Sequence, residues 1–411
     1  MSDTIKRITI EGFKSIRKLE NFELRALNVL IGANGAGKSN FVEFFRLLRA
    51  LVDQKLQVAV ATAGGVDACL YLGPKVTKQL VSKLVFLNTY GYEFTLLPTA
   101  DNRLIFSDET VVFHEQLSRR VSLGSGQAEA KLKDRRREHF DAGSRRQGVP
   151  NDVYQALSTA VAYHFHDTST TADVRRAGPI NHDEYLHPDA GNLAALLYRI
   201  RRTNPGSYER IRDVVRLAAP FFDDFKLRPM PTNPELIQLE WSQRDFDYPL
   251  LASQLSDGTL RFICLATALL QPAALPQPAL PQTVLFDEPE LGLHPYALTL
   301  LASLFQQTAQ QHGDHVAQQV IVSTQSAQLL NEFDPEDVIV VERTEGESIF
   351  TRLDSKKLSG WLEDYSLGEL WQKNVVGGGP RNEAIPLPPD EEAGGNGAYR
   401  QHGTSTGDER P

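Results

Sequence analysis

Glycines, a lysine and a serine stand in a phosphate-binding pattern between residues 32 and 39, which fits G-x-x-x-x-G-K-[ST]. In this pattern the glycines let successive backbone N–H groups face phosphate oxygens, Lys38 supplies a mobile cation, and Ser39 offers a hydroxyl to Mg²⁺. An apolar strand-like run precedes the pattern and an amphipathic helical pattern follows it, which is the context the motif requires. The sequence therefore predicts a nucleoside triphosphate site, with these residues around the phosphates: Asn34, Gly35, Ala36, Gly37, Lys38, Ser39 and Asn40.

Two carboxylates end an apolar run at residues 283–288, which reads as a strand. A carboxylate pair at the C-terminal end of a parallel strand faces the crevice where ligands bind in open α/β sheets. Asp287 is the candidate to orient Mg²⁺, and Glu288 is the candidate base for an attacking water. Acidic residues also end many strands because they are well solvated there, so the pair is informative mainly because a phosphate loop precedes it.

A third pattern, Leu-Ser-Asp-Gly, stands at residues 255–258 and leads into an apolar helix that continues through Leu270. Ser256 or Asp257 at this place can serve simply as a helix N-cap. The residues by themselves leave that interpretation and a ligand-binding one open.

The order of these three motifs resembles the ABC-type ATPases of the RecF, SMC and OLD group. The resemblance also includes Gly-Phe-Lys-Ser at residues 12–15 and Asp-Glu-Pro-Glu-Leu-Gly-Leu-His-Pro at residues 287–295, and it covers most of residues 1–375. It implies ATP and Mg²⁺ as ligands, ATP hydrolysis, and a place near the nucleotide for Lys14 and Ser15. The segment 291–295 resembles the loop that couples the two sites of a dimer in that family.

In that family the Leu-Ser-x-Gly helix completes the nucleotide site of a second subunit. The resemblance therefore implies that Ser256, the backbone of Gly258 and the helix dipole face the γ-phosphate held by Lys38 of a partner chain. Two ATP molecules would then join a head-to-head homodimer.

One position departs from the family pattern. Gln325 follows the apolar run 320–324, where many relatives place a histidine that senses the γ-phosphate. Glutamine donates an amide hydrogen bond but carries no charge, which suggests slow turnover with Gln325 as a catalytic contact. The glutamine loop of the family is not identifiable from the sequence.

The elements that must position these residues predict an α/β fold: an ABC-type P-loop ATPase head with an antiparallel β subdomain, a helical insertion and a disordered C-terminal tail. Apolar runs at 284–286, 320–323 and 338–341, separated by helical patterns, indicate a parallel sheet with crossover helices. We expect an N-terminal lobe at 1–65, the β subdomain at 66–125, a basic loop and helical insertion at 126–235, a C-terminal lobe at 236–355, a helical segment at 356–375 and the tail at 376–411.

Composition places the chain in the cytoplasm. Cys69 and Cys264 lie in apolar surroundings and read as core thiols in a reducing compartment. The N-terminus has no apolar leader and no run is long enough to cross a bilayer, so we expect no membrane association. The formal charge of −9 argues against a surface that is basic throughout. The basic run 131–146, which includes Arg135 to Arg137, is either a solvated loop or a contact for a phosphate backbone.

Four histidines have a spacing that does not support a metal site. His164 and His166 can share one face of a strand, with His182 and His187 downstream, but no cysteine or second carboxylate completes a recognisable ligand set. We interpret them as core or interface histidines.

The biological role stays open between two uses that the resemblance implies. The first is DNA repair or recombination, as in RecF-like proteins, with DNA as a partner. The alternative is a sensor in antiviral defence that gates a separately encoded nuclease or toxin, because only a short stretch and the tail follow Leu353. A transporter subunit is disfavoured by the long insertion, and a scaffold that does not hydrolyse ATP is a further alternative.

Overall fold

The computed structural model describes residues 4–86, 90–113, 119–136, 149–246, 248–272, 282–310 and 317–379. The chain divides into residues 1–379 and 380–411, and the architecture below is that of the first unit. The expected disordered tail lies, apart from its first four residues, outside the described residues. The part of the basic run 131–146 that follows Arg136 also lies outside the described residues.

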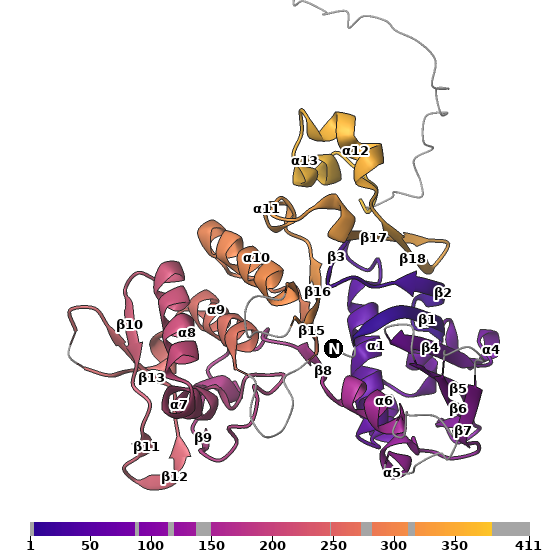
Figure 1. Cartoon of the computed structure of the whole chain (residues 1–411), viewed down its shortest axis with the longest axis horizontal. Coiled ribbons are helices and arrows are strands. Elements are labelled where there is room, and N and C mark those ends of the chain that lie inside the picture. The colour runs from indigo at the N-terminus through magenta and orange to yellow at the C-terminus, as the bar shows by residue number, and fades with distance from the viewer. Residues whose placement is uncertain are drawn as a thin grey trace, which may run out of the picture. The chain divides into compact units, whose positions relative to one another are not determined.

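A mostly parallel six-stranded sheet carries the phosphate loop (Figure 1). Every neighbouring pair is parallel except β17 and β18. The register sets Ile31 beside Thr324 and Asp287 beside Ser323, so the chain leaves β3, β15 and β16 at the same edge. In spatial order the strands are β18 (Glu347–Arg352), β17 (Val338–Thr344), β3 (Leu27–Ile31), β16 (Gln319–Thr324), β15 (Thr283–Asp287) and β8 (Ala160–Tyr163).

The parallel sheet separates two apolar cores, because successive side chains of a strand point to opposite faces. Along β3, Val29 packs into one core and Leu30 into the other; along β15, Phe286 and Leu285 divide in the same way. Both faces are therefore covered, which explains why these strands read as continuous apolar runs. The predicted α/β fold with a parallel sheet is confirmed.

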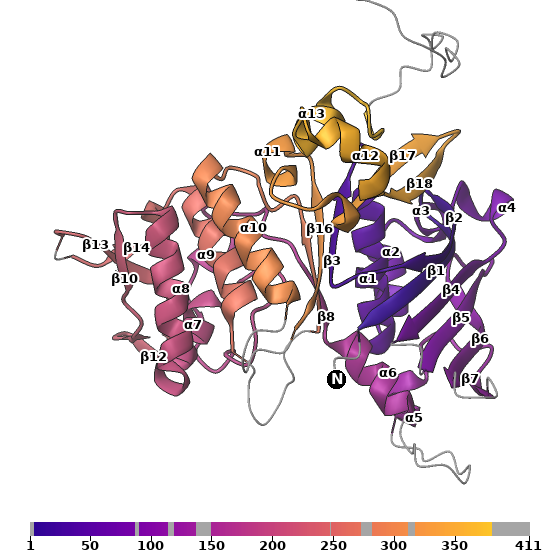
Figure 2. The ribbon, with the colours of Figure 1, turned by 45° about the horizontal axis from the view of Figure 1, so that its top comes forward.

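The first core holds the insertion helices that follow residue 190 and the helices of the C-terminal half. Figures 1 and 2 show α8, α9 and α10 side by side on one side of the parallel sheet, away from α1. Cys264 is buried there as a free thiol. The helices are α7 (Leu193–Thr203), α8 (Pro205–Ala218), α9 (Asp257–Leu270) and α10 (Pro295–Ala309), and the smaller ones are α11 (Ala327–Leu330), α12 (Ser355–Leu362) and α13 (Leu367–Gln372).

The second core lies between the parallel sheet and an antiparallel one, and α1 (Lys38–Val52) fills it. The apolar residues of α1, such as Phe41, Phe44 and Phe45, pack against both sheets and fix the start of the helix at the phosphate loop. The antiparallel strands in spatial order are β2 (Ile16–Glu23), β1 (Ile5–Phe13), β4 (Leu80–Phe86), β5 (Tyr90–Pro98), β6 (Leu104–Phe113) and β7 (Arg119–Gly124).

Three local features differ from the sequence-based expectation. Residues 66–79 hold two short helices rather than β-like segments, because Gly65 precedes the first and Pro74 opens the second. The insertion contributes β8 to the parallel sheet, and it also carries small antiparallel sheets. The helices and strands whose bounds have not yet been given are α2 (Leu56–Thr62), α3 (Val66–Cys69), α4 (Gly73–Val76), α5 (Leu132–Arg135), α6 (Val149–Ser158), β9 (Gly178–Pro179), β10 (Phe222–Phe225), β11 (Pro229–Met230), β12 (Asn233–Ile237), β13 (Glu240–Gln243) and β14 (Leu250–Leu251).

A hydrophobic span is absent from the part of the chain that the structure describes, where each helix is too short or too polar to traverse a bilayer.

Candidate functional site

The phosphate loop joins β3 to α1 and is pressed against β17 and β18. Gly37 has a φ of 114°, and a side chain there would place its Cβ 2.0 Å from Oγ of Ser348. At Gly32 a Cβ would lie 2.1 Å from the carbonyl oxygen of Val341. The two glycines are therefore required by close packing as well as by backbone conformation.

Lys38 is buried at the first position of α1 and folds back on its own loop. Its Nζ donates to the carbonyl oxygens of Gly32 at 2.8 Å and Ala33 at 3.2 Å. Burial lowers the pKa of Lys38, although the nearby charges of Glu288 and Asp287 act in the opposite direction. The ammonium group is thus held by carbonyl oxygens at the base of the loop.

A cavity of about 180 Å³ opens above the loop and brings most of the predicted nucleotide contacts together. The strands β15, β16 and β17 supply its opposite wall. Its lining residues are Asn34, Gly35, Gly37, Lys38, Ser39, Asn40, Glu288, Gln325 and Arg343. Ala36 is buried beneath the loop instead.

Asp287 and Ser39 form a pair of oxygen ligands at the edge of this cavity. Oγ of Ser39 lies 3.4 Å from Oδ1 of Asp287, and the same carboxylate oxygen accepts a hydrogen bond from Oγ of Ser323. A hydroxyl and a carboxylate, with phosphate oxygens and waters as further ligands, are the hard donors that Mg²⁺ prefers. The residues present therefore fit the metal that the sequence predicts.

Glu288 follows at the turn out of β15 and has a φ of 45°. A residue other than glycine rarely adopts this left-handed conformation, and such strained positions gather at functional sites. Its Oε1 accepts a hydrogen bond from Nε2 of Gln325, so the two predicted catalytic residues are in direct contact.

Glu290 was not predicted as a site residue, yet it braces the same turn. Its Oε1 accepts from the backbone N–H of Gln325 at 2.7 Å, whereas its buried Oε2 has no hydrogen-bond partner within the described part of the chain. Burial raises the pKa of Glu290 despite that hydrogen bond. The only sequence signal was the second glutamate of Asp-Glu-Pro-Glu.

Lys14 and Ser15 lie behind the loop rather than in the cavity. Nζ of Lys14 pairs with the carboxylate of Glu43 on α1. The buried Oγ of Ser15 accepts from Nδ2 of Asn40 at 2.6 Å and lies 2.7 Å from Oγ of Ser348. In this arrangement both residues support the loop, and their contact with nucleotide stays a prediction.

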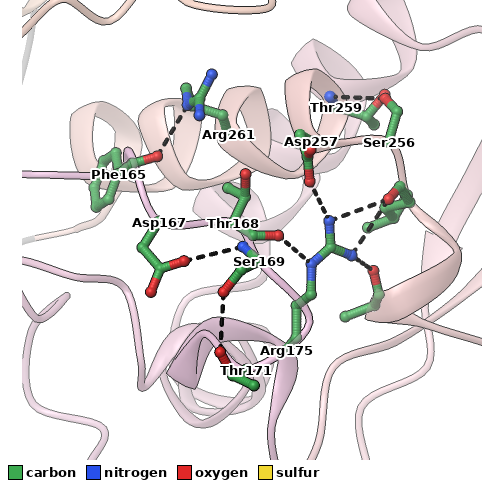
Figure 3. Close-up of polar contacts among 12 residues, drawn as sticks. Phe165, Asp167, Thr168, Ser169, Thr171, Arg175, Ser256, Asp257, Thr259 and Arg261 are labelled. Atoms are coloured by element: carbon green, nitrogen blue, oxygen red, sulfur yellow. Dashed lines mark hydrogen bonds and ion pairs between the residues drawn. The ribbon is translucent and has the colours of Figure 1, made fainter.

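Ser256 and Gly258 stand at the N-terminus of α9 and are not among the described residues that line the cavity. Ser256 is exposed, and its Oγ caps the helix by accepting from the backbone N–H of Thr259 at 3.2 Å (Figure 3). Gly258 packs against the 291–295 segment, since a Cβ there would lie 2.1 Å from the carbonyl oxygen of Gly292. The structure therefore joins this turn to the predicted coupling loop.

Arg343 and His166 are contacts that the sequence analysis missed. Nη1 of Arg343, in β17, donates to the carbonyl oxygen of Gly35 at 3.2 Å. Nε2 of His166 lies 2.7 Å from the carbonyl oxygen of Asp287. Neither position has a motif around it; His166 becomes visible only because β8 pairs with β15 and brings the following loop to the carboxylates.

The other histidines and the basic run are placed as follows. The rings of His164 and His166 lie tilted against each other with centroids 4.3 Å apart, and those of His182 and His187 are 5.9 Å apart. In the run 131–146, Arg135 donates from Nη1 to the carbonyl oxygen of Ser122 at 2.9 Å, and the later part falls outside the described residues.

These elements define the class of fold, which is that of an SMC head, an ABC-type ATPase domain. The head of an SMC protein bound to the C-winged helix domain of ScpA matches with a TM-score of 0.55 at 14% identity, over 86% of this chain and 99% of that one. An SMC head with an extended coiled coil, bound to the C-terminal domain of ScpA from Pyrococcus furiosus, matches with a TM-score of 0.50 at 15% identity, over 88% and 99%. At these identities the likeness shows the fold alone.

Residues 27–331, well over half of the chain, match the family model described as "AAA domain, putative AbiEii toxin, Type IV TA system". The chain therefore belongs to this family of AAA ATPases, and the predicted membership among ABC-type ATPases is confirmed. No curated protein matches the sequence.

Proposed function

We propose that the protein is a cytoplasmic switch that binds ATP and Mg²⁺, dimerises around two ATP molecules, and reopens on hydrolysis. One observation carries the proposal: the phosphate loop, Ser39 and Glu288 line one cavity with Asp287 beside Ser39, whereas Ser256 lies exposed outside it. A helix N-terminus is a ready anion site, so α9 is available to the γ-phosphate on a second copy. The two-fold arrangement completes both sites at once.

Each residue has a defined task in the proposed hydrolysis. Lys38 and the loop N–H groups hold the β- and γ-phosphates. Ser39 and Asp287 would hold Mg²⁺, which when bound would supply positive charge against the phosphates. Glu288 accepts the proton of the attacking water. Gln325, already bonded to Glu288, orients that carboxylate and donates an amide hydrogen bond toward the γ-phosphate.

Phosphate release tests the enzymatic part. We expect wild type to hydrolyse ATP slowly, Lys38→Ala to bind ATP much more weakly, and Glu288→Gln to bind ATP normally but hydrolyse it roughly 10²- to 10⁴-fold more slowly, because a positioned base is lost. Asp53→Asn, which removes a surface pair with Arg49 at the far end of α1, is the matched control with unchanged rate. Wild type that releases no phosphate with any nucleic acid or partner would favour a scaffold.

The role that the switch serves is proposed in two forms. The resemblance to RecF-like proteins supports DNA repair or recombination. The family description names a toxin of a toxin–antitoxin system, which supports the defence alternative, in which this ATPase gates a separately encoded nuclease or toxin. The hydrogen bond of Arg135 inside the chain weakens the case for this arginine as a DNA contact.

DNA binding at several salt concentrations separates these roles. A repair function predicts that linear or gapped DNA binds and stimulates hydrolysis, with affinity that falls steeply as salt rises. A defence function predicts no such stimulation and a response to a protein partner instead. Strong DNA-stimulated turnover would exclude the second form.

A further inference from the structure

The loop that follows β8 runs between Asp287, the proposed metal ligand, and α9, the helix that begins at the Leu-Ser-Asp-Gly pattern. At one side, Nε2 of His166 lies 2.7 Å from the carbonyl oxygen of Asp287. At the other side, Arg261 of α9 donates from Nε to the carbonyl oxygen of Phe165 at 2.9 Å and from Nη2 to that of His166 at 3.2 Å. The same guanidinium donates from Nη1 to the carbonyl oxygen of Leu291. Arg261 thus fastens this loop and the coupling segment to one helix.

A second arginine, Arg175, fastens the turn that leads into α9 (Figure 3). Its side chain is only 6% exposed. Nε donates to the carbonyl oxygen of Thr168 at 2.7 Å, and Nη1 donates to that of Ala252. Both Nη atoms reach the carbonyl oxygen of Leu255 at 3.3 Å, and Nη2 reaches Oδ1 of Asp257 at 2.7 Å.

The geometry of these bonds fixes one segment in particular. Leu255 and Asp257 flank Ser256 directly, and Ala252 lies three residues before Leu255. The rigid guanidinium fork therefore fixes the backbone that leads to Ser256 and the carboxylate of the residue that follows it. A buried guanidinium is costly unless its donors are satisfied, and this arginine satisfies them almost wholly with backbone carbonyl groups. The Asp257 carboxylate is 66% exposed, so its charge is screened and the carbonyl acceptors dominate.

We propose that Arg175 is a positioning residue for the nucleotide site of the partner copy: it holds Ser256 and the N-terminus of α9 in the orientation that receives the γ-phosphate. Arg261 and the loop from Phe165 to Thr168 connect this turn to the metal carboxylate of the same chain. A change at the nucleotide site of one chain is thereby transmitted to the N-terminus of its α9, which completes the nucleotide site of the partner copy. This inference rests on the proposed ATP-dependent dimer.

Dimerisation of the Glu288→Gln chain with ATP, followed by sedimentation, is the first test. Adding Arg175→Ala is expected to weaken dimerisation by about tenfold or more. ATP affinity of the monomer is expected to stay within about twofold, because Arg175 does not touch the phosphate loop. Arg175→Lys keeps the charge but loses the fork and should be intermediate. Arg176→Ala, at an exposed neighbour whose ion-pair atoms lie 3.8 Å from Asp173, is the matched control with unchanged dimerisation.

Mixing two inactive chains separates positioning from simple loss of folding. In a dimer of Lys38→Ala with Arg175→Ala, one composite site carries both changes and the other carries neither. The mixture is therefore expected to release phosphate severalfold faster than either chain alone. A misfolded Arg175→Ala chain, or an arginine that serves only its own nucleotide, gives no such recovery and contradicts the proposal.

The outcomes distinguish this inference from the function on which it rests. If the Glu288→Gln chain remains monomeric with ATP, the proposed function fails and the inference fails with it. If that chain dimerises and Arg175→Ala dimerises as tightly, only the inference is overturned.

Discussion

At the residue scale, the contact between Gln325 and Glu288 decides how the γ-phosphate is sensed. The amide of Gln325 donates to the carboxylate that is proposed to activate water, and it does so without a charge that could change with pH. A neutral partner adds little electrostatic stabilisation to a developing negative charge. This contact accounts for the slow turnover expected from the sequence.

Gln325→His is therefore expected to hydrolyse ATP severalfold faster, because an imidazolium adds a positive charge beside the γ-phosphate. The gain should fade as pH rises above about 6.5, where histidine loses its proton, whereas wild type lacks that dependence at this position. Steady-state phosphate release between pH 6 and pH 8.5 measures it. A rate of phosphate release that is unchanged at every pH would contradict the hypothesis that Gln325 limits turnover.

Glu290 predicts a second pH effect, on stability. Burial raises its pKa in the folded chain above the ordinary value of 4.5, so the folded state binds this proton more tightly than the unfolded state does. The cost of burying the charge is therefore absent below about pH 4 and is fully present once pH exceeds the folded pKa.

Glu290→Gln keeps an oxygen for the N–H of Gln325 and removes that cost. We expect its Tm to exceed that of wild type at pH 7 and the difference to shrink as pH falls through the folded pKa toward 4.5. Thermal unfolding at a series of pH values gives the comparison. A variant that is less stable than wild type at pH 7 would show that the charge is stabilised in the fold.

At the element scale, the close approach of Gly258 to Gly292 ties the start of α9 to the segment after β15. A Cβ at 258 would lie 2.1 Å from the Gly292 carbonyl oxygen, so one of the two backbones must move. Gly258→Ala is expected to lower the free energy of unfolding by about 1–3 kcal/mol. It should also reduce ATP-dependent dimerisation while ATP binding persists.

Gly360→Ala is the matched control for this change. Gly360 lies in α12, and a Cβ there meets nothing within 4 Å. Helix propensity predicts that this alanine stabilises the chain by up to about 1 kcal/mol. Chemical denaturation of both variants provides the free energies, and a Gly258→Ala chain as stable and as active as Gly360→Ala would show that the contact is dispensable.

The elements also show what the sequence could reveal. The strands at 27–31, 283–287 and 319–324 were predictable because burial on both faces makes them continuous apolar runs. The strand β8 was missed because it has four residues and its partner lies more than a hundred positions later. Arg175 and Arg343 carried no signal either, since their acceptors are backbone carbonyl groups that only the fold brings near.

At the scale of the whole molecule, the helices that carry the two halves of the proposed site lie on opposite faces of the parallel sheet. The phosphate loop leads into α1, which packs in one core, and the Leu-Ser-Asp-Gly turn leads into α9, which packs in the other. Motif order along the sequence predicted both halves of a site, and the family resemblance implied that the half with Ser256 serves a second copy. In the structure, the described residues that line the cavity include the phosphate loop and not Ser256. The arrangement makes a second copy of the chain the natural source of the missing half.

The molecular mass of the Glu288→Gln chain in solution, with and without saturating ATP and Mg²⁺, tests that claim most directly. We expect a monomer of 45.8 kDa without nucleotide and twice that mass with ATP. Lys38→Ala should stay monomeric because it cannot hold ATP. Ser256→Arg should also stay monomeric, although this variant does hold ATP. A Glu288→Gln chain that binds ATP and remains at 45.8 kDa would contradict the account.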